Sequence, residues 1–179
     1  MNLVNFYIAK KYAVSYFLSE GEGIEEKKKV FDLFIDKIIE YLFYLSNPTI
    51  SFDIKKKIVE NILGEYRGNQ IKNLILFMIK NKRINLIKEV YKKFSSMYLE
   101  FKNMIEVDVI SRYDLNEKDK ELISSIVFKL TSKKPYIKTS KDDKIIGGFI
   151  IRWDDKIIDA TINRKIELIV ENIINRERS

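Results

Sequence analysis

The acidic residues of this sequence are the ones that could most readily bind a metal ion or act in catalysis. The adjacent pairs Asp142-Asp143 and Asp154-Asp155 could bind a hard cation, and Asp159 could act as a general acid or base. However, neither pair lies in the spaced pattern of a calcium-binding loop, and no second acid or base accompanies Asp159 nearby in the sequence. We therefore interpret the pairs as turn residues, and Asp159 or Thr161 as the cap of a following helix.

The other usual catalytic residues are missing from the chain. It has no histidine and no cysteine, which excludes imidazole bases, thiolate nucleophiles, disulfides and Cys/His zinc sites. Gly147-Gly148 belongs to neither of the glycine-rich patterns that bind phosphate, so we interpret it as a place where a strand approaches another backbone closely. The sequence thus predicts no catalytic, cofactor or metal site, and a protein that is not an enzyme.

The net charge of +7 over 179 residues raises the question of nucleic-acid binding. Lysine outnumbers arginine by 26 to 7, although arginine is the usual residue for bidentate phosphate and base contacts. Acidic residues are also interspersed among the basic ones. The lysine runs Lys27–Lys29 and Lys55–Lys57 therefore have two interpretations, solvated helix faces or a phosphate-binding surface, of which the first is favoured.

Helical spacing of apolar residues dominates the first hundred positions. The expected helices cover about 3–19, 24–45, 52–63, 70–81 and 85–102. Glycines near 21–23 and 64–68, and Asn47-Pro48, separate the first four. The pattern predicts an N-terminal bundle of five or six helices over residues 1–104.

The hydrophobic period then changes to alternation over 104–111, which predicts a half-buried strand. The rest of the chain is expected to form a helix capped by Asn116, strands near 136–141, 149–153 and 156–159, and a last helix over about 163–176. The fold class is therefore α followed by α+β, with a small C-terminal domain of one sheet and two helices over residues 105–179.

Two features of the N-terminal half suggest a binding partner. The first helix is apolar around more of its circumference than one core contact requires, so it is buried on two sides or reserves a face for a partner. Lys82-Arg83 lies between two helices, where it could neutralise helix C-terminal carbonyls or contact an acidic partner.

The longest apolar run, Leu74–Ile79, is far shorter than the roughly 20 residues that span a bilayer, and no secretory leader is apparent. We expect a cytoplasmic protein without membrane insertion, and peripheral attachment to a membrane complex stays open.

Three segments resemble the delta subunit of F-type ATP synthase, the oligomycin-sensitivity-conferring protein family. Residues 9–13, with Ala9, Tyr12 and Ala13, are similar to the start of the family's first helix. Residues 81–84 and the strand residues 107–109 are similar to its Asn-x-Arg-Leu segment and first strand. Residues 146–159 are similar to its Gly-Gly-hydrophobic hairpin, and this is the most specific of the three likenesses.

The resemblance implies a non-catalytic subunit of the peripheral stalk, or stator, present once in the hetero-oligomeric complex. Such a subunit joins the catalytic head to the stalk's b subunits and resists rotation of the head. It is expected at the cytoplasmic face of the inner membrane, and it is expected to bind no cofactor. The N-terminal bundle would receive the N-terminal helix of an alpha subunit. The residues expected to bind this helix are Ala9, Tyr12, Ala13, Tyr16, Lys82 and Arg83. A structural motif is expected to consist of Gly147, Gly148, Asp159 and Thr161.

A basic helical bundle of the transcription antitermination type, which binds nucleic acid, is the alternative function. It agrees with the charge but gives no account of the strand at 107–109 or of the Gly-Gly hairpin. An enzyme of unrecognised type is the least favoured class, because His, Cys and a phosphate loop are all missing.

Overall fold

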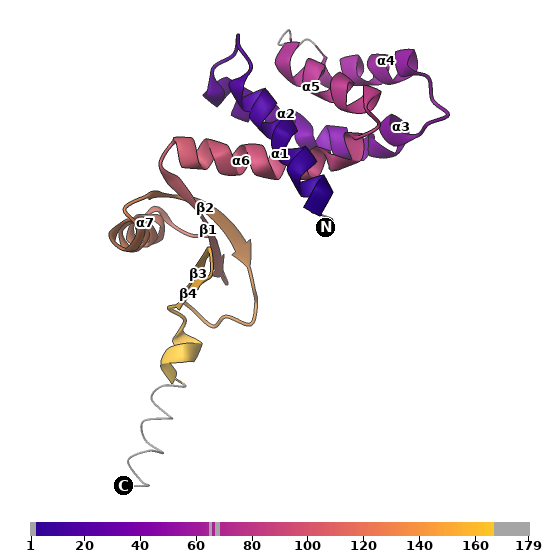
Figure 1. Cartoon of the computed structure of the whole chain (residues 1–179). Helices are drawn as coiled ribbons and strands as arrows, with labels where there is room; N and C mark the ends of the chain where they lie inside the picture. The colour runs from indigo at the N-terminus through magenta and orange to yellow at the C-terminus, as the bar shows by residue number, and fades with distance from the viewer. Residues whose placement is uncertain (1–2, 65, 67–68, 167–179) are drawn as a thin grey trace, which may run out of the picture. The chain divides into compact units, whose positions relative to one another are not determined.

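The computed structural model describes residues 3–64, 66 and 69–166 (Figure 1). The chain divides into two compact units, Met1–Tyr98 and Leu99–Ser179. Each unit has its own hydrophobic cluster, and the two clusters share no residue. The N-terminal unit is helical and the C-terminal unit is α+β, so the predicted fold class is confirmed.

The N-terminal unit consists of short helices joined by short loops. These are α1 (Leu3–Leu18), α2 (Ile24–Glu40), α3 (Leu42–Ser46), α4 (Phe52–Leu63), α5 (Asn69–Lys80), the 3-10 helix η1 (Ile84–Leu86) and most of α6 (Ile87–Phe101). The sequence predicted a single helix over 24–45, which is wrong, because the chain leaves the helical conformation at Tyr41. Apolar residues keep helical spacing across this break, so the periodicity gave no sign of it.

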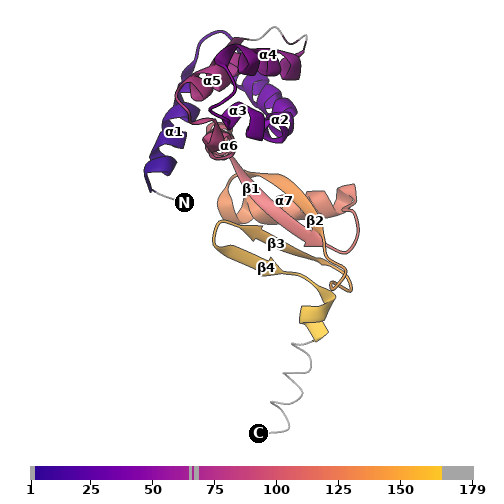
Figure 2. The ribbon, with the colours of Figure 1, turned by 90° about the vertical axis from the view of Figure 1, so that its right-hand side faces the viewer.

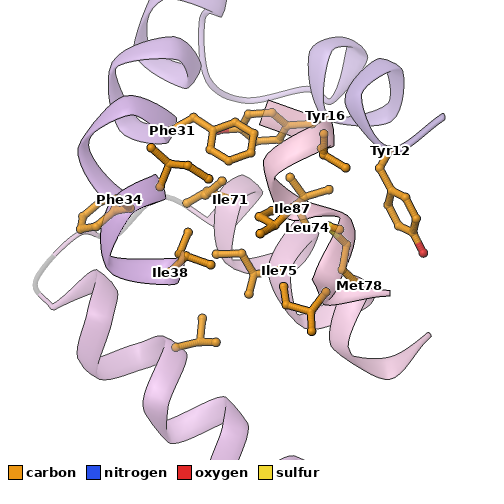
Figure 3. Packing of buried hydrophobic residues seen from close by; sticks show 14 of the residues in the cluster. Tyr12, Tyr16, Phe31, Phe34, Ile38, Ile71, Leu74, Ile75, Met78 and Ile87 are labelled. Carbon is orange, nitrogen blue, oxygen red and sulfur yellow. The ribbon is translucent and has the colours of Figure 1, made fainter. Parts of the chain in front are cut away.

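Aromatic rings from three helices pack together inside the bundle, and Figure 3 shows two of them, Tyr16 and Phe31. Tyr16 of α1 packs edge-on against Phe31 of α2, with ring centroids 5.5 Å apart, and lies 5.0 Å from Phe94 of α6. Figure 3 shows aliphatic side chains of α5, among them Ile71 and Ile75, in the same cluster. The core thus joins helices from the beginning, middle and end of the unit.

Lys27 is a core residue of this unit, although the sequence favoured a solvated face for the run 27–29. Its side chain is 2% exposed, and its Nζ donates hydrogen bonds to the carbonyl oxygens of Phe17, at 3.1 Å, and Ser19. These carbonyls lie at the end of α1, where helix carbonyls lack backbone partners. Burial lowers the pKa of Lys27, while the carbonyl contacts satisfy the ammonium group.

The C-terminal unit is built on a four-stranded sheet with the order β2-β1-β3-β4 (Figure 2). Its elements are β1 (Met104–Ser111), α7 (Glu117–Thr131), β2 (Lys134–Lys141), β3 (Phe149–Trp153) and β4 (Lys156–Asp159). Strands β1 and β2 are parallel and α7 connects them, while β3 pairs antiparallel with β1 and β4. Pro135 lies in β2, an edge strand, where its missing N–H is tolerated.

Alternation along the strands separates the two faces of this sheet. Val107, Val109 and Ile151 are fully buried, and they form a cluster with Ile123 and Val127 of α7. Asn116 caps α7 in a reciprocal capping box with Asp119, which fixes where that helix begins. The helix therefore covers one face of the sheet.

Residues 162–166 continue the chain as a helical turn after β4. The remainder of the helix predicted over 163–176 lies outside the described residues. Across the ranges that the structure describes, no helix has both the length and the hydropathy needed to cross a membrane.

Candidate partner-binding surfaces

The acidic pairs occupy turns. Asp142 Oδ1 accepts a hydrogen bond from the Lys144 N–H at 3.0 Å, which closes a local turn. Asp154 and Asp155 form the two-residue turn between β3 and β4, and Asp154 adopts a left-handed conformation with φ of 48°. Within the residues described, no group of three or more potential metal-ligating side chains comes together.

Asp159 and Thr161 organise the chain after β4. Asp159 Oδ1 accepts hydrogen bonds from the Thr161 N–H at 2.9 Å and from its hydroxyl at 2.6 Å. Thr161 Oγ1 in turn accepts from the Arg164 N–H at 3.2 Å, so Thr161 is the N-cap of the turn at 162–166. The hydrogen bonds from Thr161 hold the pKa of Asp159 below its usual value. The carboxylate is thereby committed to a structural role.

The Gly-Gly pair brings two backbones into contact. Gly148 has φ of +81°, and a Cβ built there would collide with the carbonyl oxygen of Ala160 and lie 3.0 Å from Thr161 Cα. Backbone hydrogen bonds run from Ile162 N–H to Gly147 O and from Ala160 N–H to Phe149 O. The pair therefore positions the segment that starts the last helical turn.

The four α1 residues expected to receive a partner helix lie inside the bundle. Ala9, Tyr12, Ala13 and Tyr16 are all less than 9% exposed and belong to the core cluster. The Tyr16 hydroxyl donates a weak hydrogen bond to Lys27 O at 3.4 Å, and burial raises the pKa of Tyr16. These side chains hold α1 to its own bundle, which agrees with the core alternative, and their role in binding a partner helix stays a prediction.

The opposite side of α1 carries a second apolar stripe. Leu3, Tyr7 and Leu18 are each more than 60% exposed, and the half-buried Val14 continues the same helical spacing. A shallow hollow of about 370 Å³ lies along this side, lined by Tyr7, Lys10, Lys11, Val14 and Ser15. The wide apolar circumference noted in the sequence therefore has a structural explanation: one stripe faces the core and the other faces outward.

Helix α5 adds an exposed aromatic residue beside α1. Phe77 is 59% exposed, and its ring lies 5.9 Å from the ring of Tyr12, which Figure 3 places at the edge of the packed cluster. We call the exposed apolar side chains of the two helices the α1–α5 surface. It consists of Leu3, Val4, Tyr7, Leu18 and Phe77. We treat these exposed side chains, which lie on two helices that contact each other, as candidates for a partner-binding surface.

Lys82 and Arg83 are exposed and lie directly after α5. Backbone groups satisfy the carbonyls at this helix end: the Lys82 N–H donates to Ile79 O at 2.9 Å, and the Arg83 N–H donates to Met78 O at 2.8 Å. The two cationic side chains are thus not needed to bind these carbonyls.

The sheet face that points away from α7 carries charged residues beside exposed apolar ones, among them Tyr136 and Ile157. Glu106 and Asp108 of β1 are exposed there, between strands that carry Lys138 and Arg152. Lys138 Nζ and Glu106 Oε1 form an ion pair at 2.7 Å. This pair is exposed and contributes little to stability.

Comparison with known proteins identifies the family. The profile of the family described as ATP synthase delta (OSCP) subunit matches residues 8–173, which include most of both units. The chain belongs to this family. It is 31% identical over 151 residues to the ATP synthase subunit delta of Fervidobacterium nodosum, covering 82% of this chain and 83% of that protein. The delta subunit of Caldanaerobacter subterraneus subsp. tengcongensis is 33% identical over 147 residues, covering 79% and 81%.

A solved structure shares the fold of this delta-family chain. A chain of the Toxoplasma gondii mitochondrial ATP synthase hexamer superposes with a TM-score of 0.61 and 11% identity. The superposition covers 93% of this chain and 97% of that one. The resemblance stated from three short segments is therefore confirmed at the level of the family, and the protein is a subunit of ATP synthase.

Proposed function

We propose that this chain is the non-catalytic stator subunit that joins the catalytic head of F-type ATP synthase to the b subunits of the peripheral stalk. One copy would bind the N-terminal helix of an alpha subunit and resist the torque of the central shaft. It would lie at the cytoplasmic face of the inner membrane, attached through its partners. The observation that carries the proposal is the outward apolar stripe of α1.

The α1–α5 surface has the properties that a docked helix requires. An amphipathic helix binds a groove through apolar anchors spaced along one face, and the receiving side must offer matching apolar side chains. Tyr7 and Phe77 supply large rings, which commonly dominate the energy of such interfaces. Lys10 and Lys11 border the hollow beside Tyr7 and could pair with carboxylates of the incoming helix.

The C-terminal unit is the proposed contact for the b subunits. Its exposed sheet face presents Glu106, Asp108, Lys138 and Arg152, a pattern of alternating charge that favours a helix of complementary charge. The nucleic-acid alternative would leave this unit without a role, although the family match extends across it. The stator role therefore accounts for both units.

Introducing a negative charge at Phe77 tests the docking surface. Phe77→Asp should weaken binding of a synthetic peptide of the alpha N-terminal helix at least about tenfold, because loss of a central aromatic anchor typically costs more than about 1.4 kcal/mol. The helical circular dichroism should stay native, since Phe77 is mostly exposed. Isothermal titration calorimetry on the full chain measures the affinity.

Phe43→Asp provides the matched control, because Phe43 is an exposed phenylalanine on α3 of the same bundle. It should leave the peptide affinity within about twofold of wild type. Equal weakening by both variants, or none by Phe77→Asp, would remove the α1–α5 surface as the docking site.

Affinity purification tests the partners directly. A tagged copy of the chain, purified from detergent-solubilised membranes, should bring down both alpha and b subunits. Recovery of neither, or of nucleic acid in their place, would contradict the proposed function.

A further inference from the structure

A cleft on the N-terminal unit has no role in the function proposed above. It has a volume of about 770 Å³ and lies among the end of α3, the loop into α4, α4 itself, the end of α5 and η1. Leu45, Phe52 and Ile84 form part of an apolar lining, and the charged residues that line it are Lys55, Lys80 and Lys82. Among the described residues that line the cleft, none carries a carboxylate and none belongs to α1.

Lys55 is the most informative of these lysines. Its side chain is only 8% exposed, yet within the described part of the chain it makes no hydrogen bond or ion pair. The other two buried lysines described in this unit have partners: the ammonium group of Lys27 contacts two carbonyl oxygens, and that of Lys28 pairs with Asp32. The stem of Lys55 is covered by its own bundle while its ammonium group has no partner among the described residues, so Lys55 offers a cation to a ligand that the cleft would bind.

Lys82 gives a second, independent indication. It follows α5 with φ of 56°, a left-handed conformation in which glycine is the usual residue. Backbone N–H groups already bind the carbonyls of Ile79 and Met78, so the helix end does not need the lysine side chain. Lys82 therefore adds a cation beside the cleft, although its backbone adopts a conformation that is unfavourable for lysine.

We propose that this cleft binds an acidic segment of a partner protein that inserts an apolar side chain between α4 and η1. Lys55 of α4 and the closely spaced Lys80 and Lys82 at the end of α5, with no carboxylate among the described lining residues, favour a ligand that carries several negative charges. A peptide with several carboxylates and an apolar side chain would match both the lysines and the apolar lining of the cleft. An amphiphile with a single carboxylate would match the apolar lining but not the several lysines. The inference holds whether or not the partner belongs to ATP synthase.

Photo-crosslinking in cells, with the full-length chain, tests the occupant. A benzoylphenylalanine at Asn85, which lines the cleft, should yield an adduct whose mass spectrum identifies a partner segment rich in Asp and Glu. The same probe at Asp36, an exposed position on α2 away from the cleft lining, should give no such adduct. An adduct with lipid, an adduct with a neutral or basic segment, or no adduct at all would overturn the proposal.

Charge variants show whether the lysines hold the segment. Lys55→Met keeps the length and packing of the side chain and should lower the adduct yield about tenfold, while Lys57→Met, an exposed lysine on the same helix, should not change it. Lys82→Gly should lower the yield about threefold without lowering the melting temperature, since glycine accepts the left-handed conformation. Unchanged adduct yields in both Lys55→Met and Lys82→Gly would overturn the proposal. If one variant does not fold normally, an unchanged yield in the other is enough to overturn it.

Discussion

Replacing Ala13 by glutamate is expected to unfold the helical bundle. Ala13 is fully buried against the core, and the longer side chain would bring a carboxylate into a region of aromatic and aliphatic packing. Overpacking together with an unpaired buried charge costs more than about 3 kcal/mol. That is a large fraction of the roughly 5–15 kcal/mol by which domains are stable. Far-ultraviolet circular dichroism with thermal melting measures the loss.

Ser15→Glu is the matched control, because it adds the same group at an exposed position on the same helix. Its melting temperature should stay close to that of wild type, since exposed substitutions usually change stability by less than about 0.5 kcal/mol. Trp153, the only tryptophan, reports on the C-terminal unit and should keep its native fluorescence in both variants, because the two cores share no residue. A normally folded Ala13→Glu protein would show that Ala13 faces solvent.

The second large effect is expected at Gly148. An alanine there would place its Cβ against the carbonyl oxygen of Ala160, in a left-handed conformation that L-residues rarely adopt. The steric and conformational costs together amount to about 3 kcal/mol. Because backbone atoms form the obstacle, no side chain can rotate to relieve it. Unfolding followed by Trp153 fluorescence should therefore begin at a clearly lower denaturant concentration.

Gly23→Ala is the comparison for Gly148→Ala. A Cβ at Gly23 meets nothing within 4 Å, and the residue has φ of −65°, which alanine adopts readily. The Trp153 transition should not move in this variant. If Gly148→Ala left the transition where wild type has it, the close approach of the two backbones would be refuted.

The sequence predicted the order of the elements well because hydrophobic period and capping residues act locally. Asn116 and the alternation at 104–111 each mark an element through its own residues, without help from the rest of the chain. The break at Tyr41 was missed for the same reason. No glycine or proline marks it, and the apolar spacing continues across it.

The binding residues could not be predicted in the same way. The α1 sequence has two apolar stripes, and periodicity cannot show which of them faces the bundle. Ala9 and Ala13 face inward, where α1 packs in its own core, whereas Tyr7 and Leu18 face outward. Spacing did contain the signal for the second stripe, since Leu3, Tyr7, Val14 and Leu18 repeat with helical period.

The sequence also did not predict which lysines are buried. The runs 27–29 and 55–57 look alike in sequence, and both resemble solvated helix faces. Lys27 nevertheless ends on the carbonyls of α1, and Lys55 ends in a cleft, because their neighbours in space come from other helices. Only the three-dimensional arrangement distinguishes a lysine that binds helix carbonyls, a lysine that lines a cleft and a solvated one.

Retention of the catalytic head on the membrane tests the stator role most directly. In membranes from cells that lack this chain, the alpha subunit should shift to the soluble fraction and ATP-driven proton pumping should be lost. Wild-type protein should restore both, and Phe77→Asp should restore neither fully. An alpha subunit that stays on the membrane, with normal proton pumping in the absence of this chain, would contradict the account.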